Sequence, residues 1–162
     1  ISAFSLAQDI GVSVAEAKEY MERYFDTYRG VKRYMEQVVE TAREKGYVET
    51  LMHRRRALPE LKSSNFNMRS FGERVALNMP IQGTAADIMK LAMVAVEKRL
   101  KRELPEAKLV LQVHDELIVE CPEPQAAAAA KLLEEEMGQV AHLSVPLTAE
   151  AYWGRNWLEA KG

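Results

Sequence analysis

The sequence has little that could cross-link the chain or hold it in a membrane. Cys121 is its only cysteine in 162 residues, which excludes an intramolecular disulfide and favours a reducing compartment. No apolar run reaches the 18 residues or more that a membrane-spanning helix needs. Eight glycines and six prolines, beside 48% hydrophobic residues, exclude a fibrous or disordered chain. The composition therefore predicts a globular domain or a part of one.

Several catalytic motifs are also missing. The sequence contains no Gly-x-x-x-x-Gly-Lys-Ser/Thr loop, no Gly-x-Gly-x-x-Gly turn, no Gly-x-Ser-x-Gly elbow and no paired cysteines for zinc. These absences argue against several enzyme classes. The residues after Ile1 have no basic region, no long apolar stretch and no initiator methionine, so we expect neither a secretory signal nor a natural start.

Charge is nearly balanced over the whole chain but is unevenly distributed. The formal net charge is −2, whereas residues 43–74 carry eight Lys or Arg against four Glu. Residues 103–136 carry nine acidic residues against two lysines. A basic stretch followed by an acidic one could hold a polyanion beside a metal ion, and two solvated faces of opposite sign are the alternative.

The pattern of the N-terminal third predicts two helices. Ser13 and Glu16 form a capping-box pattern that predicts a helix over residues 14–28. We expect its stripe of tyrosines, at positions 20, 24 and 28, to be buried. Gly30 predicts a break, and Lys45-Gly46 predicts the end of the second helix.

The remainder alternates hairpins and helices. Residues 47–58 predict a hairpin with arginines near its tip, and residues 66–102 a helix that Pro80 must bend or divide. A second hairpin over 109–120, a helix to about residue 140 and a strand over 145–152 follow. Helices packed on a small antiparallel sheet make the expected fold class α+β.

The sharpest chemical feature is the sequence His114-Asp115-Glu116 inside the second hairpin. A tight turn normally uses Asn-Gly or Asp-Gly, so something other than turn chemistry accounts for these residues. A carboxylate on a rigid hairpin is a suitable ligand for Mg²⁺, which prefers oxygen. Successive side chains of a strand point to opposite faces, so we rank Asp115 above Glu116 as a ligand. An ordinary polar turn is the alternative.

A second set of polar residues lies on the long helix. Arg74, Asn78 and Gln82 are spaced by four and would share one face if Pro80 only bends the axis. They suit contacts with phosphates, sugars or base edges, and a solvated helix face is the alternative. The Arg54–Arg56 run is either a solvated charge cluster or a phosphate contact. Asp87 is interpreted as a local hydrogen-bonding residue rather than a metal ligand.

Two motifs together resemble the C-terminal part of the family A DNA polymerases, the bacterial DNA polymerase I type. They are Asn78-Met79-Pro80-Ile81-Gln82-Gly83-Thr84-Ala85-Ala86-Asp87 and Gln112-Val113-His114-Asp115-Glu116-Leu117. The resemblance spans essentially the whole chain, including Gly46–Leu51 with the arginine run and the Ser2–Gln8 opening. It implies a right-hand polymerase in which residues 1–46 are the later fingers helices and residues 47–162 a palm segment with a metal-binding hairpin at 109–120.

The resemblance also implies an activity and the residues that carry it. It implies a DNA-directed DNA polymerase that adds deoxynucleotides to a primer 3′-hydroxyl with two Mg²⁺ ions. Asp115 would be a catalytic residue and metal ligand, with Glu116 a less critical catalytic neighbour. The residues expected to bind DNA are Arg74, Asn78, Gln82, His114 and Arg69. Expected partners are primer–template DNA, deoxynucleoside triphosphates and the upstream part of the polymerase. The expected location is the bacterial cytoplasm at the nucleoid, in replication or repair.

One departure from the family pattern limits these expectations. Two-metal phosphoryl transfer needs carboxylates from two palm strands, and this chain contains only the second of them. The first aspartate, the helix that grips the nucleotide and the thumb would lie before Ile1, so we expect the isolated chain to be inactive. The alternatives are a noncatalytic nucleic-acid-binding module and a metal-dependent phosphoesterase that uses His114, Asp115 and Glu116.

Overall fold

The computed structural model describes residues 2–161 and confirms an α+β fold made of helices and two small antiparallel hairpins. The chain forms two compact units. The first contains the chain up to Glu49 together with Arg55–Pro80, and the second contains Thr50–Arg54 and the chain from Ile81 onward. No helix within residues 2–161 is long and apolar enough to cross a membrane.

The first unit begins with three helices, α1 (Ala3–Ile10), α2 (Val14–Thr27) and α3 (Arg29–Lys45). The predicted capping box is present: Ser13 Oγ accepts a hydrogen bond from Glu16 N, and the Glu16 carboxylate accepts one from Ser13 N. Helix α3 ends at Gly46, whose φ of +79° is the left-handed conformation that glycine adopts without strain. The break between α2 and α3 falls at Tyr28, not at Gly30.

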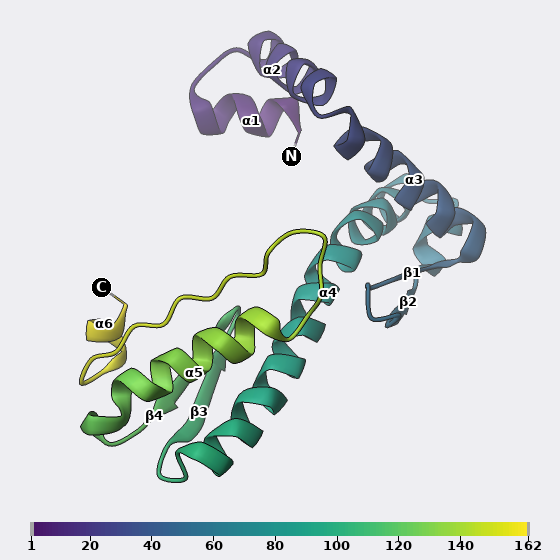
Figure 1. The fold of residues 1–162 in the computed structure, drawn as a ribbon. Helices are drawn as coiled ribbons and strands as arrows, with labels where there is room; N and C mark the ends of the chain where they lie inside the picture. Colours follow the sequence, from purple (N-terminus) through teal and green to yellow (C-terminus); the bar gives the residue numbers. More distant parts are fainter. Residues whose placement is uncertain (1, 162) are drawn as a thin grey trace. The chain divides into compact units, whose positions relative to one another are not determined.

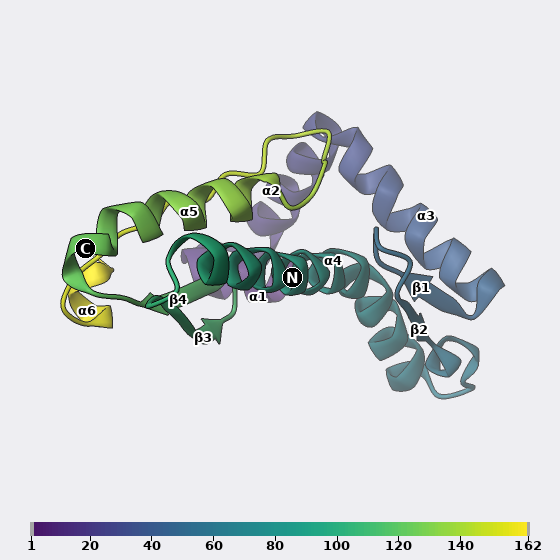
Figure 2. The ribbon, with the colours of Figure 1, turned by 60° about the horizontal axis from the view of Figure 1, so that its bottom comes forward.

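The strands β1 (Tyr47–Glu49) and β2 (Arg55–Ala57) confirm the first predicted hairpin, and the short helix η1 (Pro59–Lys62) follows. Figure 2 shows α3 beside this hairpin. The buried core of the first unit joins α3, β1, η1 and the start of α4 through five residues: Ala42, Val48, Leu58, Leu61 and Ala76.

The predicted burial of the tyrosine stripe on α2 is wrong. Tyr20, Tyr24 and Tyr28 are 45%, 50% and 54% exposed, respectively. Among the described residues of α2, Ala17 is the one that is buried, and the helix contacts α1 and α3. Helical spacing identified the stripe but could not determine whether another element covers it.

Helix α4 (Phe66–Glu103) runs through Pro80 as one 38-residue helix, so the proline does not divide it. In the second unit, the part of α4 after Pro80 is followed by β3 (Lys108–Val113), β4 (Glu116–Glu120), η2 (Glu123–Gln125) and α5 (Ala126–Gln139). Figure 1 shows the β3–β4 hairpin beside α5 and the C-terminal half of α4. Four buried residues join these elements: Val96, Leu100, Ala107 and Leu132.

The predicted strand over residues 145–152 is wrong. That segment is irregular, and it leads to the short helix α6 (Trp157–Ala160). Pro146 has no N–H to donate to a sheet, and the backbone N–H of Ala151 donates instead to the Glu134 carboxylate on α5, at 3.0 Å. The alternating pattern in the sequence therefore reflects an extended segment tethered to a helix.

Candidate functional site

The β3–β4 hairpin presents His114 and Asp115 in its two-residue turn. Strand β3 ends at Val113, which pairs with Glu116 at the start of β4. His114 has a φ of +50°, in the left-handed region where glycine or asparagine is usual, and this conformation costs about 1 kcal/mol for other residues. The turn thus carries local strain at the position where the sequence predicted a functional motif.

The hairpin rests on a packed support. Leu109, Leu117 and Val119 pack against the core that Val96 and Leu100 form on α4. The Gln112 side-chain amide donates a hydrogen bond to the His114 carbonyl oxygen at 2.8 Å, which restrains the turn. The exposed carboxylate of Asp115 therefore lies on a hairpin that packs against a hydrophobic core. A metal ligand needs such a rigid scaffold to keep its position.

Glu116 has a cationic partner that the sequence did not reveal. Lys161 Nζ, at the end of α6, lies 3.2 Å from the Glu116 carboxylate and 5.3 Å from the centre of the Trp157 ring. Both charged side chains are largely exposed, so this ion pair contributes little to stability. The Asp115 carboxylate has no ion-pair or hydrogen-bond partner among residues 2–161, so the two neighbouring acids differ in their surroundings.

The donor set of the hairpin fits only part of a metal site. Asp115 supplies the hard oxygen donors that Mg²⁺ prefers, on an exposed turn. Across the described residues, no group of three or more His, Cys, Asp or Glu side chains is arranged to hold a metal ion. Mg²⁺ commonly takes only one or two protein carboxylates and completes its coordination with water and phosphate oxygens, so Asp115 fits as one ligand of such a site.

The other predicted contacts lie along α4 and in the loop before it. Arg74, whose guanidinium donates to Ser70 Oγ at 3.0 Å, and Asn78 are exposed in the first unit. Gln82 is exposed in the second unit. Arg69 donates to the carbonyl oxygens of Ser63 and Ser64, at 2.9 and 2.7 Å, and so closes the loop before α4. This contact gives Arg69 a structural role in addition to the DNA contact predicted for it.

Two arginines of the first hairpin, Arg54 and Arg55, contact carboxylates. Arg54 contacts the Oδ1 atom of Asp87 through Nε at 2.7 Å and through Nη2 at 2.6 Å. Arg55 donates to Glu49 at 3.2 Å, and its guanidinium lies 4.6 Å from the centre of the Tyr47 ring. Arg54 and Arg55 therefore have different carboxylate partners, although the sequence presented them as one charge cluster.

Asp87 is the centre of a buried polar network in the second unit. Its side chain is on α4 and the residue is 4% exposed, and Thr50 Oγ1 donates to its Oδ2 atom at 2.8 Å. The hydrogen bonds from Arg54, and then from Thr50, hold the pKa of the Asp87 carboxyl below its usual value, so it is ionised at neutral pH. Thr84, one turn earlier on α4, accepts a hydrogen bond from Leu51 N at 3.0 Å.

Sequence reasoning interpreted Asp87 as a hydrogen-bonding residue, which is correct, but expected a local partner. Its partners Arg54 and Thr50 are 33 and 37 residues away. The available signal was the spacing of Thr84 and Asp87, two polar residues three apart on a helix whose following turns are apolar. That pattern predicts a buried polar contact but does not identify the partner.

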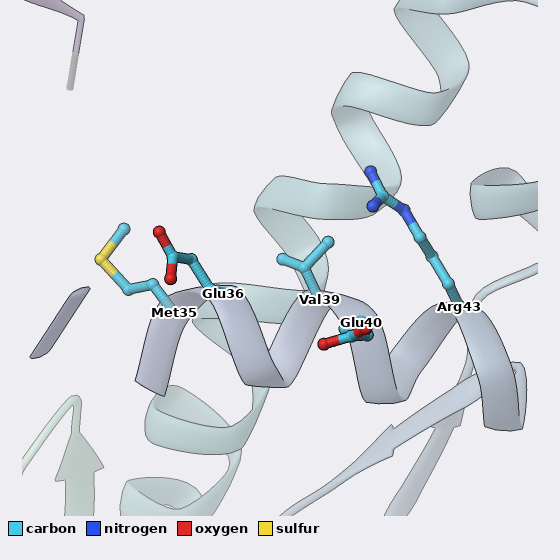
Figure 3. Close-up of a pocket in the computed structure, with 5 residues that line it drawn as sticks. All are labelled: Met35, Glu36, Val39, Glu40 and Arg43. Atoms are coloured by element: carbon cyan, nitrogen blue, oxygen red, sulfur yellow. The ribbon is translucent and has the colours of Figure 1, made fainter. Parts of the chain in front are cut away.

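A hollow of about 440 Å³ lies on α3 in the first unit, lined by Met35, Glu36, Val39, Glu40 and Arg43. Figure 3 shows that all five lining residues come from this one helix. The guanidinium of Arg43 forms an ion pair with Glu73 on α4, in the same unit. None of the sequence-predicted site residues lines this hollow, so it does not mark the candidate site.

Comparison with known sequences gives matches along nearly the whole chain. A family model described as DNA polymerase family A matches residues 1–159. DNA polymerase I of Bacillus caldotenax is 52% identical over 161 residues, and that of Bacillus subtilis is 49% identical over 161 residues. Each alignment covers 99% of this chain but only 18% of the relative. The chain thus spans less than a fifth of the length of these relatives.

A solved structure is similar over the same range. It is the POL domain of Pol1 from M. smegmatis in complex with DNA primer–template and dNTP. The TM-score is 0.94 at 46% sequence identity, and the match covers 99% of this chain and 28% of that one.

Proposed function

The chain belongs to DNA polymerase family A, and we propose that it supplies part of the catalytic domain of a DNA-directed DNA polymerase. The reaction would be the addition of deoxynucleotides to a primer 3′-hydroxyl, directed by a template, by two-metal phosphoryl transfer. In this proposal residues 1–46 are the later fingers helices and residues 47–162 are a palm segment. The protein would work in the bacterial cytoplasm, at the nucleoid, in replication or repair.

The observation that carries the proposal is the exposed carboxylate of Asp115 on a strained turn that the core supports from behind. A two-residue hairpin turn without glycine or asparagine is unfavourable, so a role outside folding accounts for it. Asp115 would bind the metal ions, and Mg²⁺ is the cation that its hard oxygen donors suit. When bound, these ions supply the charge neutralisation that the developing phosphoryl transition state requires.

The neighbouring residues have distinct proposed tasks. The Lys161 ion pair holds the Glu116 carboxylate beside the turn, where it adds negative charge near Asp115 without being the main ligand. His114 is exposed in the same turn and is proposed to contact the primer. Hydrogen bonds from such side chains suit the minor groove, where acceptors occur in every Watson–Crick pair, so DNA is held without sequence preference.

Arg74, Asn78 and Gln82 are proposed to extend this contact with primer–template DNA. Each is exposed on α4, and each has side-chain donors for acceptors of sugars, bases or phosphates. Arg69 is proposed as a contact close to the DNA backbone. Because two of its hydrogen bonds close the Ser63–Ser64 loop, it would act mainly by shaping that loop.

Joining this chain to an upstream polymerase region tests the proposal. In DNA polymerase I of Bacillus caldotenax, the 161 aligned residues would be replaced by this chain, and the chimaera would be supplied with primed template, Mg²⁺ and all four deoxynucleotides. We expect template-dependent primer extension, read on a denaturing gel. A folded chimaera that binds the template without extending the primer would instead favour a noncatalytic nucleic-acid-binding module.

A further inference from the structure

The tip of the β1–β2 hairpin is a small rigid element fixed to α4 in the second unit. Thr50 N donates to Arg54 O, and His53 N donates to Thr50 O, both at 3.0 Å. His53 has a φ of +62°, in the left-handed region. A three-residue hairpin loop typically ends with a residue in this conformation. The bond from Leu51 N to Thr84 Oγ1 then fixes the loop to the helix. The backbone around Arg54 is therefore held in one conformation.

The side chain of Arg54 is also held in place, by contacts along the edge of the guanidinium that carries Nε and Nη2. Nε and Nη2 contact Asp87 Oδ1, which is buried, while the Arg54 side chain as a whole is 56% exposed. A guanidinium has five N–H donors in a plane, so the edge that faces away from Asp87 keeps donors for another acceptor. An arginine whose rotamer is already fixed loses little further entropy when it binds a ligand.

We propose that this outer edge of Arg54 is a binding site for a backbone phosphate of DNA, and that Asp87 is the positioning residue that aims it. Phosphate is the ligand because its oxygens match the planar donors of a guanidinium and because the site is open to solvent. This inference rests on the proposed function, since it adds a contact with the same DNA. It also distinguishes Arg54 from Arg55, because only Nε of Arg55 contacts a carboxylate and that partner, Glu49, is itself one-third exposed, whereas the Asp87 side chain that fixes Arg54 is 5% exposed.

Replacing Asp87 tests the proposal, because simple electrostatics and positioning of Arg54 predict opposite changes in DNA affinity. Asp87→Ala removes a negative charge, so electrostatics alone predicts tighter binding of a polyanion. If Asp87 aims Arg54, the variant should instead bind duplex DNA about three- to tenfold more weakly, because the released arginine must be ordered again on binding. Affinity of the 162-residue chain for a short duplex would be measured by fluorescence anisotropy over a range of salt concentrations.

Matched variants separate positioning from damage to the fold. Thr50→Val removes the hydroxyl that donates to the same carboxylate and accepts from Met52 N and Arg54 N, so it loosens the loop around Arg54 and should weaken DNA binding in the same direction as Asp87→Ala. Arg54→Lys keeps the charge but loses the planar donors, and should bind about threefold or more weakly. Arg54→Gln should also lower the salt slope of the binding constant by about one. Arg102→Gln, on the last turn of α4, removes an equal charge and should leave binding unchanged.

Circular dichroism would establish whether each variant is folded. If Asp87→Ala does not fold, the DNA affinity of Arg54→Lys tests the proposal instead. The inference is overturned if folded Asp87→Ala binds as tightly as the wild type or tighter, or if Arg54→Lys binds as the wild type does. If the wild-type chain itself shows no salt-dependent binding of duplex DNA, the Arg54 site is overturned, whereas the proposed function is decided separately by primer extension with the chimaera.

Discussion

Replacing Asp115 by alanine in the chimaera is expected to lower the rate of nucleotide addition by at least about a thousandfold. Metal ions stabilise a transferring phosphoryl group by several kcal/mol, and each 1.36 kcal/mol corresponds to a factor of ten in rate. Asp115 lies on an exposed turn with no partner among residues 2–161, so its removal breaks no contact of the described fold. The loss should therefore appear in the rate constant at saturating DNA and nucleotide.

DNA affinity of the Asp115→Ala variant should be nearly unchanged, because the carboxylate donates no hydrogen bond to DNA and its removal only reduces repulsion of phosphates. Glu120→Ala is the matched control, since it removes an exposed carboxylate at the other end of the same hairpin. It should extend primers at close to the rate of the unmodified chimaera. A loss of less than about tenfold for Asp115→Ala would contradict the role assigned to this residue.

The isolated 162-residue chain is expected to bind duplex DNA but to extend no primer. Two-metal transfer needs carboxylates that hold both ions, and no group of three candidate ligands exists among the described residues. The contrast with the chimaera should be complete: extension with the upstream region and none above background without it. The measurement is primer extension by the purified chain under the same conditions.

The isolated chain also distinguishes the remaining alternative. Template-directed extension by the chain alone would show that the site needs no upstream carboxylate and would contradict the prediction. Metal-dependent cleavage of DNA by the chain alone would instead favour a phosphoesterase that uses His114, Asp115 and Glu116. Asp115→Ala serves as the control for contaminating nuclease or polymerase, since a contaminating activity would survive the substitution.

Local patterns in the sequence predicted most elements of the fold. The capping box at Ser13, the stop at Gly46 and the His114–Asp115 turn depend on residues close together in the chain, and the structure has each of them. The predictions that were wrong depended on distant contacts. Periodicity placed the tyrosines of α2 on one stripe but could not determine what covers it, and alternation over 145–152 could not supply a partner strand.

The candidate site shows the same limit. The motif identified Asp115 and the hairpin that carries it, because both lie within a few residues. The Arg54–Asp87 and Lys161–Glu116 pairs join residues that are 33 and 45 positions apart. Spacing rules in a single sequence predict contacts within a helix or hairpin and do not predict pairs at such separations. The roles predicted for Arg69, Arg74, Asn78, Gln82 and His114 remain predictions, since they concern DNA that only a complex can place.

The proposed role of Asp115 depends on where the metal ion binds, which a crystal structure of the chimaera would show. The chimaera would be crystallised with primer–template, a nonhydrolysable deoxynucleotide and Mn²⁺ in place of Mg²⁺, and the ion would be located by its anomalous scattering. We expect a peak within about 2.5 Å of an Asp115 carboxylate oxygen, with the remaining protein ligands supplied by the upstream region. A bound nucleotide and ion with the Asp115 carboxylate well outside coordination distance would contradict it.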